Sequence, residues 1–86
     1  MKYLLICSCG GKEQKAKNAY EILFPGQPTP QVVRGSDAIM KLAHQTNNDH
    51  IKAISKIKGN FAYYVNIDDN NEIIEEYDLN SGRRTK

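Results

Sequence analysis

The residues best suited to chemistry lie at the end of the first apolar run, where the chain reads Cys7, Ser8, Cys9, Gly10, Gly11 and Lys12. Open α/β sheets bind ligands at turns between a strand and a helix, because free backbone N–H groups and the helix dipole attract an anion. Glycines let that anion approach the backbone. The spacing fits neither the P-loop nor the dinucleotide fingerprint, since Glu13 follows Lys12. This turn is an alternative site for phosphate or a nucleotide; the simpler interpretation is a tight turn in which Ser8 caps the helix.

The two thiols of this turn suggest a second kind of chemistry. A cysteine at a helix N-terminus has a stabilised thiolate, which makes it a nucleophile. The fragment Cys7-Ser8-Cys9-Gly10 resembles the Cys-Ser-x-Gly motif that ends the first strand of sugar phosphotransferase enzyme IIB proteins. This resemblance implies that Cys7 carries phosphate. Glu13 and Gln14 stand where that family usually has Thr-Ser.

A redox site is a further alternative for the same cysteines. Residues 29–33 are similar to the strand entry of glutaredoxin-like proteins, a resemblance that implies redox chemistry. Cys7 and Cys9 lack the C-x-x-C spacing that this chemistry requires. Two inert thiols, buried or half-buried, are the simpler interpretation.

Two histidines join the cysteines as candidate metal ligands. Cys7 and Cys9 are closer together than the thiols of a usual zinc site, and His44 and His50 do not share one helical face. Both histidines stand among polar neighbours, which is typical of solvated side chains. The sequence therefore predicts no metal site and no cofactor.

Charge is distributed unevenly along the chain. Residues 1–59 hold nine Lys/Arg and four Asp/Glu, net +5, and residues 60–86 hold three and six, net −3, which together give +2. The basic part includes Lys52, Lys56 and Lys58, which can contact the phosphates of a nucleic acid if they share a face with Lys41 and Arg34. The acidic part can meet a basic protein surface. The simpler interpretation is that both charges serve solubility. The acids are Asp68, Asp69, Glu72, Glu75, Glu76 and Asp78.

Two adjacent tyrosines accompany these acids. Because side chains alternate along a strand, either Tyr63 or Tyr64 must point away from the core. An outward tyrosine can anchor a partner or stack on a base. A packing pair with Tyr77 across the hairpin is the plainer alternative.

The elements that must position these residues alternate in the N-terminal half. Lys2 to Cys7 is predicted as a buried strand. Lys12 to Leu23 is predicted as a helix, because its apolar residues recur at helical spacing up to Pro25. Gln31 to Arg34 is predicted as a short strand, and a second helix follows Gly35.

The C-terminal half carries the predicted hairpin. His50 to Lys58 fits a helix or a strand; we favour the helix, because Asp49 can cap its start and Gly59 its end. Phe61 to Ile67 and Glu72 to Leu79 read as antiparallel strands. In the second strand we expect Ile73, Tyr77 and Leu79 on one face. The order β-α-β-α-(α)-β-β predicts an α/β (or α+β) domain: a small mixed sheet with a C-terminal antiparallel hairpin, and helices packed on the sheet.

Size and composition limit the organisation of the chain. A chain of 86 residues has room for one hydrophobic core. We expect a single domain over residues 1–79 and a flexible basic tail over residues 80–86, which lacks an apolar anchor. The longest apolar run, Tyr3 to Cys7, is too short for a membrane helix or a secretory signal. Two cysteines separated by one residue form no disulfide framework. The sequence therefore predicts a soluble, cytoplasmic protein.

These observations favour a binding module over a stand-alone enzyme, because no Ser/His/Asp set and no close carboxylate pair stands at usable spacing. We expect a regulatory or inhibitory protein of the kind that phages and mobile elements commonly encode. The predicted partner is another protein, although nucleic acid and a dimer of this chain are open alternatives. The predicted contact surface consists of Tyr63, Tyr64, Glu72, Glu75, Glu76 and Asp78.

Overall fold

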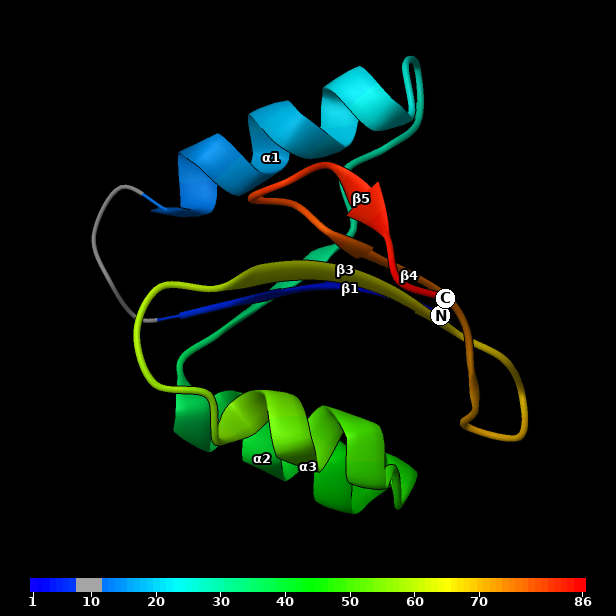
Figure 1. Ribbon diagram of the computed structural model, residues 1–86. Coiled ribbons are helices and arrows are strands. Elements are labelled where there is room, and N and C mark those ends of the chain that lie inside the picture. The colour runs from blue at the N-terminus through cyan, green and yellow to red at the C-terminus, as the bar shows by residue number, and fades with distance from the viewer. Residues whose placement is uncertain (8–11) are drawn as a thin grey trace.

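The computed structural model describes residues 1–7 and 12–86 (Figure 1). In chain order they form β1 (Lys2–Ile6), α1 (Lys12–Leu23), β2 (Gln31–Arg34), α2 (Ser36–Thr46), α3 (Asp49–Ser55), β3 (Ala62–Ile67), β4 (Ile73–Asp78) and β5 (Arg83–Arg84). This order confirms the predicted mixed α/β domain and its C-terminal antiparallel hairpin. No helix within the described ranges is long and apolar enough to cross a bilayer.

The strands form one five-stranded sheet in the order β2-β1-β3-β4-β5. β1 pairs in parallel with β2, and the other neighbours pair antiparallel. Figure 1 shows α1 on one face of the sheet and α2 with α3 on the other. The N-terminal strand thus lies inside the sheet, and β2 and β5 are its edges.

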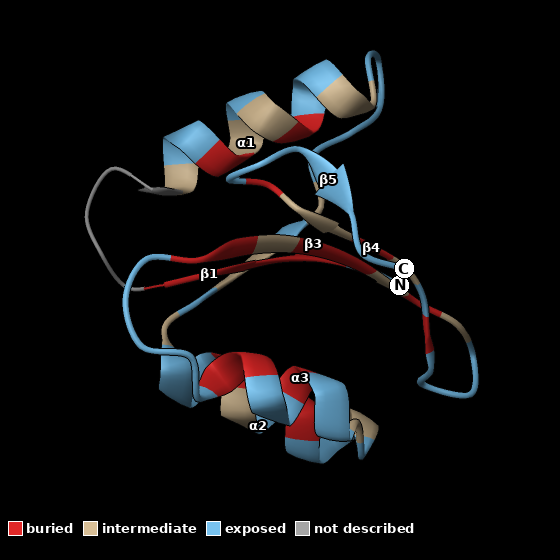
Figure 2. Cartoon of the chain, in the orientation of Figure 1, coloured by how far each residue is buried: buried red, intermediate tan, exposed pale blue. Residues whose placement is uncertain are grey.

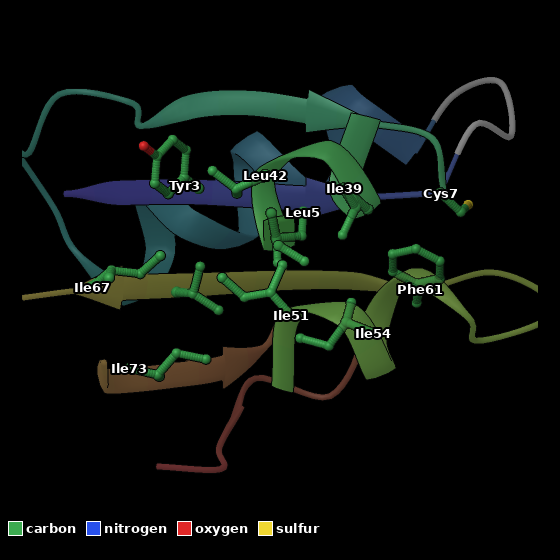
Figure 3. Packing of buried hydrophobic residues seen from close by; sticks show 12 residues of the cluster. Tyr3, Leu5, Cys7, Ile39, Leu42, Ile51, Ile54, Phe61, Ile67 and Ile73 are labelled. Atoms are coloured by element: carbon green, nitrogen blue, oxygen red, sulfur yellow. The ribbon is translucent and has the colours of Figure 1, made fainter. Parts of the chain in front are cut away.

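Burial follows from this layered arrangement. Tyr3 and Leu5 of β1 belong to the core under α2 and α3, whereas Leu4 and Ile6 belong to the core under α1. Because both faces of β1 are covered, its sequence is continuously apolar. Figure 2 shows the resulting band of buried residues along β1 and β3, and in Figure 3 Leu42 and Ile51 extend from α2 and α3 toward Leu5.

The helical interpretation of the segment that begins at His50 is confirmed, although its ends differ from those expected. The side chain of Asn48, not that of Asp49, caps α3, accepting a hydrogen bond from the Ile51 N–H at 3.0 Å. Ile51 and Ile54 bury one side of the helix. The helix ends at Ser55, so Gly59, with φ at 93°, lies in the loop to β3 and does not terminate the helix.

A register shift in the hairpin changes which residues share a face. Asn66 pairs with Glu75 and Ile67 with Ile73, which leaves Ile74 as an extra residue. Ile73 therefore packs in the core under α2 and α3, whereas Tyr77 and Leu79 pack on the α1 side. The expectation that these three share one face is wrong, because a bulge interrupts the two-residue alternation of a strand.

The last residues form a strand that the sequence did not predict. β5 pairs Arg84 with Tyr77 and Arg83 with Asp78. The Glu76 N–H also donates to the Lys86 carbonyl at 2.9 Å. The flexibility expected of residues 80–86 stays a prediction.

Candidate functional site

An open groove runs between α3 and the β4 side of the sheet. Its polar end has a volume of about 430 Å³ and is lined by Asn48, His50, Glu72, Ile73, Glu76, Thr85 and Lys86. A smaller apolar hollow of about 180 Å³ is lined by His50, Ala53, Ile54, Ile57, Tyr63 and Glu76. His50 and Glu76 line both, so the two hollows adjoin, and we call them together the α3–β4 groove.

A buried carboxylate stands at the centre of this groove. Glu76 is only 4% exposed, and its two oxygens each have a partner. His50 Nε2 lies 2.5 Å from Oε2, and the Thr85 hydroxyl donates to Oε1. These contacts satisfy a charge that would be costly to bury alone. Glu76 therefore contacts His50 and Thr85 within the fold, and its predicted contact with a partner stays a prediction.

His50 is the exposed member of this set. Its side chain is 57% exposed although Nε2 contacts the buried Glu76. An imidazole held by a carboxylate through one nitrogen has a fixed orientation and can offer the other nitrogen to a ligand. The arrangement thus presents a positioned imidazole, with Nδ1 as the available atom.

Backbone hydrogen bonds of the C-terminal residues position the Thr85 hydroxyl beside Glu76. The Thr85 N–H donates to the Glu76 carbonyl at 2.8 Å, and the Lys86 N–H donates to the same oxygen at 3.2 Å. Glu76, on β4, and His50, on α3, are thereby joined to the C-terminus. The groove consequently depends on contacts between residues that are distant in the sequence. His50 and Glu76 are 26 residues apart, and Glu76 and Thr85 are 9 residues apart.

The apolar end of the groove carries a half-buried tyrosine. Tyr63 lies opposite Asp78 on β4, and its ring centroid is 6.2 Å from that of Phe61. Burial, and then the carboxylates of Asp78 and Glu76, raise the pKa of Tyr63. Ile57 is 40% exposed beside it. Tyr63 and Ile57 therefore offer an aromatic and an aliphatic surface for an apolar contact.

The predicted contact residues are divided between the two faces of the hairpin. Tyr63, Glu72 and Glu76 line the α3–β4 groove. Tyr64 lies on the other face, only 1% exposed, and its hydroxyl donates to Glu75 at 3.0 Å. The expectation that one of the adjacent tyrosines points away from a core is wrong, because helices cover both faces of β3.

Several of the acids have roles inside the fold. Asp68 accepts from the N–H groups of Asn70 and Glu72, and Asp78 accepts from the Asn80 N–H, so both carboxylates hold turns. Glu72 is exposed at the polar end of the groove. Glu72 is thus the predicted acid best placed to meet a partner.

Sequence reasoning missed the contributions of His50, Thr85 and Ile57. Thr85 stood in the expected flexible tail, and His50 was considered only as a metal ligand or a solvated side chain. Within the described ranges, no group of three His, Cys, Asp or Glu side chains is placed to hold a metal. No spacing in the chain links His50 to Glu76, so only the folded sheet brings them together.

The cysteine-containing turn is only partly described. Cys7 is 5% exposed in the core under α2 and α3, and its thiol lies 3.7 Å from Asn60 Oδ1. Ser8, Cys9, Gly10 and Gly11 lie outside the described residues. Anion binding and thiol chemistry at this turn stay predictions.

The basic residues lie in different places. Lys52, Lys56 and Lys58 are exposed on and after α3. Arg34 and Lys41 line another groove, of about 400 Å³, which contains no residue of α3. Its lining residues are Tyr3, Gln31, Val32, Val33, Arg34, Ala38, Lys41, Leu42 and Gln45.

Comparison with known proteins yields no relative for this chain: no family model, no curated protein and no solved structure matches it. The functional interpretation therefore rests on the chemistry of its own residues.

Proposed function

We propose that this protein is a small binding module, regulatory or inhibitory in role, whose α3–β4 groove holds a basic segment of a partner protein. The observation that supports this most is the shared location of Tyr63, Glu72 and a carboxylate-held His50 in one open groove. A reduced, cytoplasmic setting belongs to the same proposal.

The two ends of the groove suit different residues of one basic segment, because Tyr63 and Glu72 lie at opposite ends of the hairpin. A lysine or arginine side chain packs its aliphatic stem on apolar surface and keeps its charged head among polar groups. Tyr63 and Ile57 supply the apolar surface, and Glu72 supplies an exposed carboxylate. Tyrosines in partly desolvated pockets are frequent energetic anchors of protein interfaces. The buried Glu76 acts indirectly, by holding His50.

Site-specific photo-crosslinking tests the proposal. A photoreactive residue at Ile57, 40% exposed, has a matched control at Ile22, which is 78% exposed on α1. In native-host extract, the Ile57 probe should form an adduct whose cross-linked partner peptide contains lysine or arginine. Glu72→Lys should abolish that adduct, and Glu21→Lys, the same charge change on α1, should leave it intact. Equal adducts at both probes, or an adduct indifferent to Glu72→Lys, would contradict the proposal.

The alternatives lead to other outcomes. Binding of nucleic acid by Lys52, Lys56 and Lys58 predicts that Lys52→Glu, not Glu72→Lys, removes the partner. An anion site at the cysteine-containing turn predicts that phosphate perturbs the amides of Gly10, Gly11 and Lys12.

A further inference from the structure

The outer edge of β2 is a strand edge without a neighbour among the described residues, because the sheet order ends there. The Gly35 N–H donates to the Ile6 carbonyl at 2.9 Å. Since backbone groups alternate in direction along a strand, Gln31 and Val33 also face β1. Val32 and Arg34 consequently direct their N–H and C=O groups outward, where another strand can pair with them.

This edge borders the groove of about 400 Å³ between β2 and α2, which we call the β2–α2 groove. Its apolar lining includes Tyr3, Val33 and Leu42. Figure 3 shows Tyr3 and Leu42 beside each other below the ribbon of β2. The groove also contains the polar residues Gln31, Arg34, Lys41 and Gln45. An edge strand next to a helix-walled groove is the arrangement in which proteins add an extended peptide to a sheet.

Positive charge marks the rim of the β2–α2 groove. Arg34 and Lys41 are both exposed there. Arg34 Nη1 lies 3.4 Å from Glu13 Oε1, with side chains 56% and 37% exposed. Exposed ion pairs of this kind are weak, so Arg34 can exchange Glu13 for an incoming carboxylate.

We propose that the β2–α2 groove binds an extended acidic segment of a protein by strand addition to β2. Backbone pairing with Val32 and Arg34 requires a peptide, which distinguishes this occupant from a nucleic acid. Side chains of the segment alternate between the two faces of the sheet: acidic side chains face the groove and Lys41, and apolar side chains face the α1 side, where Val32 packs. The proposal is independent of the α3–β4 groove, and together the two surfaces make the module a link between segments of opposite charge.

The experiment is a titration of the ¹⁵N-labelled full chain, followed by amide NMR shifts. The probe is the peptide acetyl-Asp-Val-Glu-Val-Asp-amide. Its controls are acetyl-Lys-Val-Lys-Val-Lys-amide and an acidic copy with methylated backbone nitrogens, which cannot donate to a strand. The acidic probe should shift the amides of β2 and of the α2 face that contains Lys41. The lysine peptide and the methylated copy should leave those amides unchanged.

Two variants sharpen the result. Lys41→Glu should weaken the acidic peptide about five- to tenfold, because it reverses a rim charge. Lys52→Glu makes the same change on exposed α3 and should leave the affinity unchanged. The NMR spectrum of each variant reports its folding directly. No shift at β2, equal shifts with the lysine peptide, or binding that survives both methylation and Lys41→Glu would overturn the proposal.

Discussion

The α3–β4 groove and the β2–α2 groove differ in the chemical groups that they offer to a partner. The first depends on side chains: Glu76 is buried between His50 and Thr85, and Tyr63 supplies an aromatic surface. The second depends on the backbone edge of β2, with Arg34 and Lys41 at its rim. Our two proposals therefore assign a cationic side chain to the first surface and an extended, negatively charged segment to the second.

This difference shows how chain topology uses the uneven charge of the sequence. The acidic C-terminal part forms the β3–β4 hairpin on one side of the sheet, and the basic N-terminal part supplies the opposite edge. β1 and β3 separate the two. The two grooves still differ in charge: Glu72 and Lys86 both line the α3–β4 groove, whereas Arg34 and Lys41 line the β2–α2 groove.

The largest expected change in the free energy of unfolding comes from the core that holds α3 in place beside the α3–β4 groove. Ile51 is fully buried. Ile51→Ala should lower the free energy of unfolding by about 2–5 kcal/mol, because it removes packed methyl groups and leaves a cavity. Ile57→Ala, at the exposed end of the same segment, should cost less than about 1 kcal/mol. Urea denaturation measures both, and equal losses would contradict the assigned faces of α3.

The next effect concerns the buried carboxylate. Glu76→Gln replaces the buried carboxylate that contacts His50 and accepts from the Thr85 hydroxyl, and should cost about 1–3 kcal/mol. Glu72→Gln, at an exposed position of the same groove, should change stability by less than about 0.5 kcal/mol. Urea denaturation again separates the two. If both variants were equally stable, the proposed positioning role of Glu76 would lose its basis.

The covered face of the hairpin is expected to control how stability changes at alkaline pH. Burial, followed by the hydrogen bond to Glu75, raises the pKa of Tyr64. The folded state then retains a proton that the unfolded chain releases above about pH 10, so stability is intact below that pH and falls as pH rises beyond it.

Tyr64→Phe should therefore reduce the loss of stability above pH 10, at the expense of one hydrogen bond at neutral pH. Urea midpoints between pH 7 and pH 11 measure this loss for the wild type and the variant. An unchanged slope in the variant would show that Tyr64 does not control alkaline unfolding.

The smallest effect is that of salt on association. Raising salt from about 0.05 to 0.5 M should slow binding at both grooves, because it shortens the screening length to a few ångströms. Unfolding free energies should change little, since exposed charges contribute little to stability. Stopped-flow mixing measures the rates, with the acidic peptide for the β2–α2 groove and acetyl-Lys-Leu-Arg-Leu-Lys-amide for the α3–β4 groove. Association rates that do not change with salt would contradict the proposal that charge steers binding at both grooves.

Much of the fold was predictable because its signals are local. The apolar spacing of Ala16 and Tyr20 predicts α1, and the apolar run of β1 reflects burial on both faces. The bulge at Ile74 was not predictable, because alternation says nothing of an extra residue. Strand β5 was missed because its polar sequence carries no burial signal, and backbone pairing with β4 defines it.

The candidate site was only partly predictable for the same physical reason. Tyr63 and Glu72 lie on the hairpin that the sequence indicated. His50 and Thr85 become functional candidates only through Glu76, a contact that depends on how α3 and the C-terminus dock on β4. Tyr64 and Glu75 were predicted to lie on the contact surface, but they lie on the face of the hairpin that α1 covers. Alternation in the sequence does not reveal that helices cover both faces of the sheet.

One NMR experiment tests the account of two opposite grooves most directly. The labelled protein is titrated with acetyl-Lys-Leu-Arg-Leu-Lys-amide, and separately with the acidic peptide described above. We expect the basic peptide to shift the amides around Ile57, Tyr63 and Glu72 while those of β2 stay unchanged, and the acidic peptide to do the reverse. If both peptides shift the same residues, or if neither shifts a groove, the account is contradicted.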